Sequence, residues 1–129
     1  MKRDSRTRYL CSELVKVEWQ SETGALRATG ILEEIWLDGA CIQTLAPLPS
    51  RTQVWIVASR ALFLGTLAEC ESQLDGYFSR VAFEAQSRWS PRSFRPEHMV
   101  STQTVLARWL KQNLAAMEAP KVRAAGQNE

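Results

Sequence analysis

The sequence predicts a mainly β fold: a six-stranded antiparallel β-barrel followed by a C-terminal α-helix. Three patterns support this prediction. Apolar and polar residues alternate with a period of two through most of the chain up to Glu84, as half-buried strands require. Turn residues interrupt the alternation about every 8–12 residues, a spacing typical of small all-β domains. After Val100 the apolar residues recur at three and four, which is the period of a helix.

Six segments carry the strand pattern. Val15, Val17 and Trp19 share one face of the first segment, and Gly30 inside the second indicates a bulge or a barrel corner. The fourth segment has apolar residues on both faces, which predicts a central position or contact with the helix. The predicted strands are residues 14–19, 25–35, 40–45, 52–59, 61–71 and 77–84.

The turn between the second and third strands is predicted at Asp38-Gly39. Glycine adopts a positive φ without steric cost, and aspartate tolerates the left-handed region, so this pair favours a tight hairpin. Residues 72–76 are predicted to connect the fifth strand to the sixth, because they end in Asp75-Gly76.

The remainder of the chain is predicted to be a polar loop and a helix. In the loop at 86–98, Trp89 and Phe94 are expected to pin the segment to the barrel while its arginines face solvent. The alternative is that these arginines and aromatic rings stack on nucleic-acid bases. Ser101 or Thr102 is predicted to cap a helix of about four turns. Its apolar face is expected to cover a barrel end or to pack on a partner.

Length and composition favour one soluble, cytoplasmic domain. The 129 residues match the usual size of a single domain. No apolar run approaches the ~18 residues of a membrane span, and the N-terminus is charged rather than a signal segment. The three cysteines are widely spaced, which suits buried free thiols in a reducing compartment better than disulfides. With a single histidine, the sequence has too few ligands for a Cys/His zinc site and does not favour a His-based triad.

Positive charge gathers at the N-terminus. Lys2, Arg3, Arg6 and Arg8 against Asp4 give +3 in the first nine residues, whereas the formal charge of the whole chain is +2. Such a cluster favours an anionic partner, whether phosphate, nucleotide or nucleic acid. The alternative is a solvated terminus that binds nothing.

Two motifs resemble those of the PilZ domain family. Arg8-Tyr9 is similar to the second arginine of the family's N-terminal arm, which carries two arginines four residues apart, and Asp4 stands at the first position. The family's hairpin signature has Asp or Asn, then Ser, then Gly, and the matching residues here are Glu34, Trp36 and Gly39. The order of arm, strands, hairpin and final helix also resembles the family over residues 3–118.

The resemblance implies a PilZ-like architecture with a basic arm at 1–10, a barrel plus helix at 11–118 and a disordered tail at 119–129. It also implies cyclic di-GMP as the ligand, with arginines meeting phosphate and guanine and the hairpin residues hydrogen-bonding a base edge. No metal or other cofactor is expected. The candidate binding residues are Arg3, Arg6, Arg8, Glu34, Trp36 and Gly39.

The substitutions at the signature positions change the expected activity. Glu34 is one methylene longer than aspartate, and Trp36 replaces a serine hydroxyl, so we expect weak or absent nucleotide binding. The resemblance therefore implies a stand-alone signalling domain that is either a cyclic di-GMP receptor or an adaptor. An adaptor of this kind acts through protein-protein contacts with a partner that the sequence does not identify.

Two other classes of function follow less directly. A small barrel that binds single-stranded nucleic acid would use the basic arm and the 86–98 loop. Against it, Trp19, Trp55 and Trp109 fall on apolar faces and the charge outside the arm is near zero. We do not expect an enzyme, because the sequence has no Gly-rich phosphate loop and no metal-ligand spacing. Glu33-Glu34 is a poor carboxylate pair, because adjacent strand residues point to opposite faces.

Overall fold

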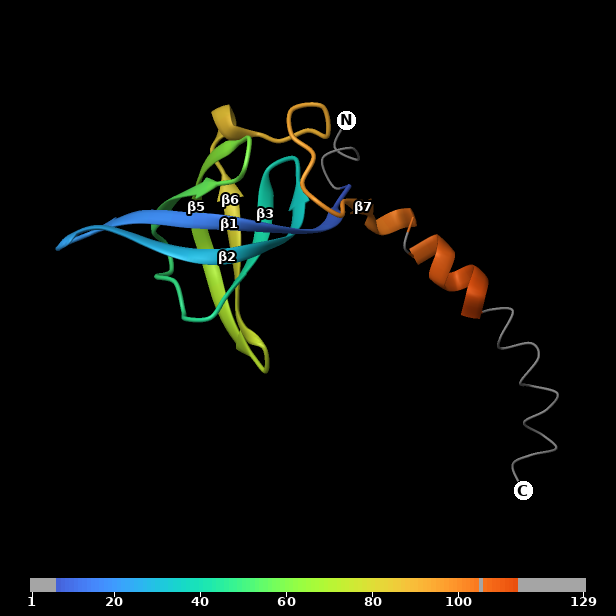
Figure 1. The fold of residues 1–129 in the computed structure, drawn as a ribbon, viewed down its shortest axis with the longest axis horizontal. Helices are drawn as coiled ribbons and strands as arrows, with labels where there is room; N and C mark the ends of the chain where they lie inside the picture. Colours follow the sequence, from blue (N-terminus) through green and yellow to red (C-terminus); the bar gives the residue numbers. More distant parts are fainter. Residues whose placement is uncertain (1–6, 105, 114–129) are drawn as a thin grey trace, which may run out of the picture.

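A computed structural model describes residues 7–104 and 106–113 of the chain. These residues form a closed barrel of six antiparallel strands and a short C-terminal helix, so the predicted fold class is confirmed (Figure 1). The predicted tail at 119–129 lies outside the described residues, as do Arg3 and Arg6 of the predicted arm.

The barrel closes because β1 pairs with both β2 and β4. Around the barrel the strands follow the order β2, β3, β6, β5, β4 and β1, and β1 pairs with β2 to close the ring. The elements are β1 (Tyr9–Ser21), β2 (Gly24–Trp36), β3 (Gly39–Thr44), β4 (Gln53–Val57), β5 (Leu62–Gln73), β6 (Gly76–Phe83), the 3-10 turn η2 (Ala85–Ser87) and β7 (Val100–Ser101). The helix occupies residues 102–104 and 106–113.

Two predicted strand boundaries are wrong. β1 begins at Tyr9 rather than Leu14, so Tyr9 and Leu10 belong to the barrel and not to the arm. Inward and outward positions alternate from Tyr9 onward, but the inward Glu13 and the outward Leu10 and Leu14 hide this alternation in the sequence. The connection at 72–76 is also shorter than predicted, because β5 and β6 leave only two residues, 74 and 75, in the turn.

The hairpin turn is Leu37-Asp38, so the predicted turn at Asp38-Gly39 is wrong by one residue. Gly39 is the first residue of β3 and pairs with Trp36. Among the described glycines, positive φ occurs only at Gly24 (126°) and Gly76 (137°). Gly39 therefore serves a steric purpose rather than a conformational one.

Of the two features predicted at Gly30, a bulge or a barrel corner, the bulge does not occur there. The register of the β2–β3 pair shifts between Leu32 and Glu34 instead. At Gly30 a Cβ would lie 2.8 Å from Ile42 Cγ2 and 2.9 Å from the Gln43 carbonyl oxygen. Glycine is needed there because β3 approaches β2 closely.

The barrel interior holds one hydrophobic core, drawn from all six strands and from the 86–98 loop. Phe63 stacks on Phe83 with ring centroids 4.9 Å apart. In the loop, Trp89 is 2% exposed and Phe94 is 7% exposed, so the prediction that these two rings pin the loop is confirmed. The loop arginines at 88, 92 and 95 are exposed.

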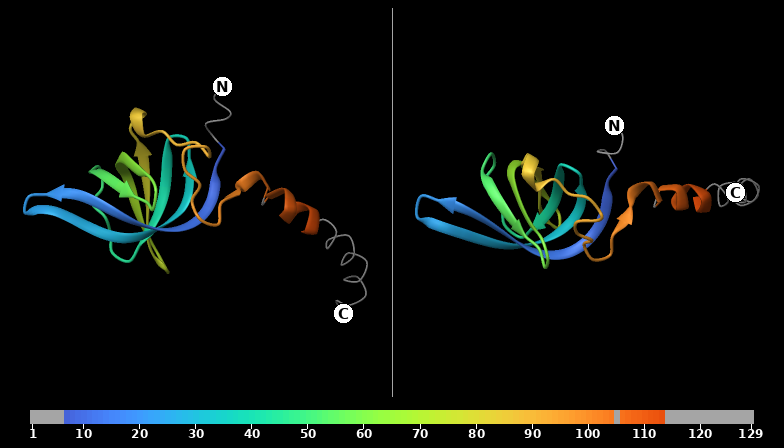
Figure 2. Two further views of the ribbon diagram at one scale, coloured as in Figure 1. Left: turned by 45° about the horizontal axis from the view of Figure 1, so that its top comes forward. Right: turned by 90° about the horizontal axis from the view of Figure 1, so that it is seen from above.

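Two faces predicted to be covered are exposed instead. In β4, Val54 and Ile56 are buried, but Trp55 on the other face is 42% exposed because the helix does not cover this strand. The helix leaves the barrel beside β7 and projects away from it (Figures 1 and 2). Leu106 and Trp109 on its apolar face are more than half exposed, so the prediction that this face covers a barrel end is wrong.

The bulged start of β1 carries a buried carboxylate that the sequence analysis missed. Glu13 is 5% exposed. Its Oε2 accepts hydrogen bonds from the Ser59 amide (3.2 Å) and hydroxyl (2.9 Å), and its Oε1 accepts one from the Glu97 amide (3.0 Å). One side chain thereby joins β1 to the loop after β4 and to the segment before β7.

Candidate functional site

The base of the N-terminal arm lies against the β2–β3 hairpin. The Arg8 guanidinium carbon is 4.0 Å from the centroid of the Trp36 ring, which is a cation–π contact. Trp36 also lies against Gly39, where a Cβ would come within 2.7 Å of the ring atoms Cε2 and Cζ2. With these two contacts Trp36 is only 8% exposed. Gly39 is thus the residue that makes room for the indole.

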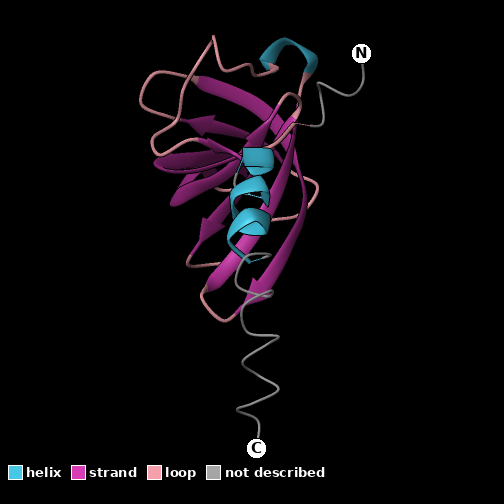
Figure 3. Cartoon of the chain, turned by 90° about the vertical axis from the view of Figure 1, so that its right-hand side faces the viewer, coloured by secondary structure: helices cyan, strands magenta, loops and turns pink. Residues whose placement is uncertain are grey.

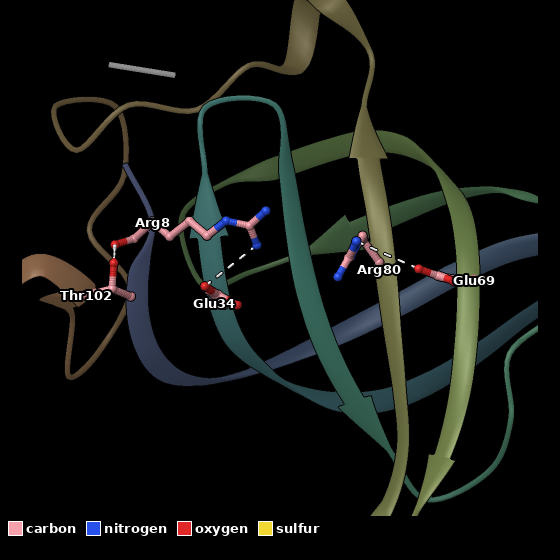
Figure 4. A network of polar contacts seen from close by, with 5 residues as sticks. All are labelled: Arg8, Glu34, Glu69, Arg80 and Thr102. Atoms are coloured by element: carbon pink, nitrogen blue, oxygen red, sulfur yellow. Dashed lines mark hydrogen bonds and ion pairs between the residues drawn. The ribbon is translucent and has the colours of Figure 1, made fainter. Parts of the chain in front are cut away.

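Arg8 is held from two further directions (Figure 4). Its Nη1 is 3.8 Å from Glu34 Oε2, a long ion pair at the outer surface. Its carbonyl oxygen accepts hydrogen bonds from the Thr102 amide (2.9 Å) and the Thr102 hydroxyl (3.0 Å). The start of the helix therefore fixes the backbone of the arm while the hairpin holds its side chain.

Four of the six candidate residues meet in this place. They are Arg8, Glu34, Trp36 and Gly39. The side chains contact one another rather than line an open site. The other two candidates, Arg3 and Arg6, lie outside the described residues.

A row of polar side chains continues the site across the barrel surface. Glu34 pairs with Cys41, Cys41 with Arg80, and Arg80 with Glu69, on the neighbouring strands β2, β3, β6 and β5. Arg80 Nη1 lies 3.7 Å from Glu69 Oε2 (Figure 4). The sequence analysis missed this row, because alternation marks each residue as outward-facing but does not give the register between distant strands.

The register shift in β2 places both Glu33 and Glu34 on the outer surface. Buried Leu32 and Ile35 flank them, and both carboxylates raise the pKa values of Cys11 and Cys41. The prediction that they point to opposite faces is therefore wrong, because it assumed a regular strand. Burial, and then the carboxylate of Asp75, raises the pKa of Glu33 itself.

The three cysteines are free, as predicted, but each is partly buried rather than buried. Burial and neighbouring carboxylates, Glu13 first among them, raise the pKa of Cys11 to about 12. Burial and the carboxylates of Glu34 and Glu33 raise the pKa of Cys41 to about 11. Both thiols are thus weak nucleophiles at neutral pH, because the thiolate is the reactive form.

These shifts predict a pH dependence of stability. The folded state favours the neutral thiols, so their contribution to the free energy of unfolding is complete below pH 9, near the ordinary pKa of a thiol. It is lost as the pH rises towards 11–12. Urea unfolding at pH 8, 9, 10 and 11 should therefore show a steeper loss of stability for the native chain than for the Cys11→Ala/Cys41→Ala variant. Parallel curves for the two proteins would contradict the assignment.

A shallow hollow lies beside the arm, lined by Thr7, Tyr9, Leu37 and Trp89 among others, with a volume of about 300 Å³. Ligand pockets usually measure about 300–1,000 Å³ and enclose most of the ligand. The hollow is at the lower end of that range, and a cyclic dinucleotide is a large ligand. The described surface near the arm therefore offers little enclosed space for one.

In comparisons with known proteins, no family model, no curated protein and no solved structure matches this chain. Within residues 7–104 and 106–113, no group of three or more potential metal ligands comes together. No helix in the same residues is long and apolar enough to cross a membrane.

Proposed function

We propose that this chain is a stand-alone PilZ-like signalling domain that works as an adaptor, binding a protein partner without needing cyclic di-GMP. One observation carries the proposal: Arg8 and Trp36, at two positions that would meet the nucleotide, contact each other. The proposal of a PilZ-like domain is based on the resemblance of the arm and hairpin motifs to that family. The closed six-stranded barrel is compatible with it.

The contacts of Arg8 oppose nucleotide binding. An arginine that reached a phosphate or guanine would first leave the Trp36 ring, a contact worth about 0.5–2 kcal/mol. It would also leave Glu34, an exposed pair worth about 0–1 kcal/mol. A micromolar ligand gains only about 8 kcal/mol in total, so losses of this size lower affinity considerably.

The indole of Trp36 adds a second obstacle. A serine hydroxyl both donates and accepts hydrogen bonds, whereas an indole only donates. The ring is 8% exposed and therefore offers almost no free face for stacking on a base. Weak or absent binding follows from both residues together.

Isothermal titration of the full chain with cyclic di-GMP tests this proposal, with GTP as a control ligand and a repeat at higher salt. We expect no heat specific to the cyclic dinucleotide. Specific binding at micromolar affinity or tighter would contradict the adaptor function, and it would mean that the arm leaves Trp36 when the ligand arrives.

The second candidate is a barrel that binds single-stranded nucleic acid. One observation favours it, since Trp55 is 42% exposed and bases stack on exposed rings. However, the two aromatic residues that alternate with the loop arginines in the sequence, Trp89 and Phe94, are buried in the core and cannot stack on bases. Its test is anisotropy with labelled oligonucleotides, where affinity should fall steeply with salt if this function were correct.

A further inference from the structure

An apolar groove runs across the outer face of β1, β2 and β3. Its volume is about 280 Å³, and its lining is mostly apolar. Leu14 pairs with Ile31, and Ile31 pairs with Gln43, so the three side chains form one row. Leu14 is 68% exposed, and Leu45, which also lines the groove, is 89% exposed. Large apolar side chains gathered in a groove commonly mark an interaction site.

The helix, cyan in Figure 3, has an apolar face whose large side chains are exposed. Leu106, Trp109 and Leu110 lie on one side of the helix, because residues three and four apart are neighbours there. They are 56%, 54% and 43% exposed. Residues 102–113 also carry two cations, Arg108 and Lys111, and no acid.

Two acidic residues lie beside the groove. Gln43, in the groove lining, donates a hydrogen bond to the Asp75 carbonyl oxygen (2.8 Å), and Glu33 follows Ile31 by two residues on the same outer face. Neither carboxylate forms an ion pair with a described residue. Partial burial, and then the nearness of Asp75, raises the pKa of Glu33.

We propose that two copies of this chain form a dimer by exchanging helices, so that the helix of each copy lies in the β1–β2–β3 groove of the other. The three apolar side chains of the helix fill the groove. Arg108 and Lys111 lie towards Glu33 and Asp75.

The connection to the barrel explains why the occupant is a second copy. β7 ends at Ser101 and the helix begins at Thr102, so no loop separates them. Thr102 is itself fixed to the Arg8 carbonyl by two hydrogen bonds. Leu14 lies four residues along β1 from Leu10, the partner of β7, which is roughly 13 Å of strand. To reach its own groove the helix would have to reverse direction where the backbone is held.

A reciprocal exchange also gives a closed assembly. Each copy supplies one helix and one groove, so both apolar surfaces of both chains are covered around a two-fold axis. Stable dimers usually bury about 1,200–2,000 Å² in total, and two helix-in-groove contacts supply twice the area of one. This inference is independent of the proposed function, because it uses neither the Arg8 side chain nor its contacts with Glu34 and Trp36.

Light scattering coupled to size-exclusion chromatography of the full chain tests the dimer. We expect a mass of twice 14.6 kDa for the native protein. Leu45→Glu, which blocks the groove, and Trp109→Glu, which blocks the helix, should each give monomers. Both positions are exposed, and circular dichroism checks that each variant is folded. The matched control Leu62→Glu changes a leucine that is 56% exposed outside the groove and should remain a dimer.

Mixing the two monomeric variants identifies the contact. The Leu45→Glu chain keeps an intact helix and the Trp109→Glu chain keeps an intact groove, so the mixture should form a heterodimer through one helix and one groove. A monomeric native chain would overturn the proposal. So would dimers that survive Leu45→Glu, which would indicate helix-to-helix contact, or dimers that survive Trp109→Glu, which would indicate groove-to-groove contact. Dissociation with Leu62→Glu, or the absence of a heterodimer in the mixture, would also overturn it.

Discussion

Replacing Trp89 by alanine should lower the free energy of unfolding by about 3–5 kcal/mol, the usual cost of removing a large buried aromatic side chain. Trp89 is 2% exposed and packs edge-on against Tyr9, with ring centroids 5.3 Å apart. Its indole N–H donates to the Phe94 carbonyl oxygen (2.8 Å), and its amide donates to the Leu37 carbonyl oxygen (2.8 Å). One residue therefore holds the 86–98 loop, the β2–β3 turn and the start of β1 together.

Urea unfolding followed by circular dichroism measures this effect. The matched control is Trp55→Ala, which removes the same side chain from a position that is 42% exposed and should cost much less. If the two substitutions had equal effects, the loop would not depend on Trp89 as described.

Replacing Glu13 by alanine should cost about 2–4 kcal/mol, because it removes the acceptor for three hydrogen bonds at once. The Ser59 and Glu97 amides would lose their partner, and leaving a buried donor unpaired costs about 1–3 kcal/mol. Glu13→Gln should be milder, since the amide keeps one oxygen of similar geometry.

Amide hydrogen exchange locates the effect within the molecule. In Glu13→Ala the amides of Ser59 and Glu97 should lose protection before the barrel strands do. Ser12→Ala is the matched control. Ser12 precedes Glu13 in the chain, but its side chain is exposed and forms no hydrogen bond within the described residues. Unchanged protection at both amides would contradict the role assigned to Glu13.

The strands could be predicted because alternation depends only on which residues face the core. The same alternation would have predicted that Glu13 points inward, because it is in phase with buried Val15 and Val17. A carboxylate is buried only when it has hydrogen-bonding partners. The sequence does not identify the partners of Glu13, because Ser59 and Glu97 are distant from it in the chain. Register and long-range hydrogen bonds therefore limited the prediction.

The arm and hairpin show a similar limit. The resemblance correctly placed Arg8, Glu34 and Trp36 near one another. The turn propensity of Asp38-Gly39 assigned Gly39 to the turn, whereas the glycine is needed to admit the Trp36 ring, a contact that only the fold reveals. Likewise, the helical period identified the apolar face of Trp109 but not what covers it.

Titration of a variant with the family signature restored tests the central claim most directly. Asp4→Arg, Glu34→Asp and Trp36→Ser together give two arginines four residues apart and the Asp-x-Ser-x-x-Gly hairpin, with Arg8 released from the indole. Thermal unfolding first establishes that this variant is folded. The account predicts that it binds cyclic di-GMP while the native chain does not. Equal binding by both proteins, or no binding by either, would contradict the claim that these positions set the function of this barrel.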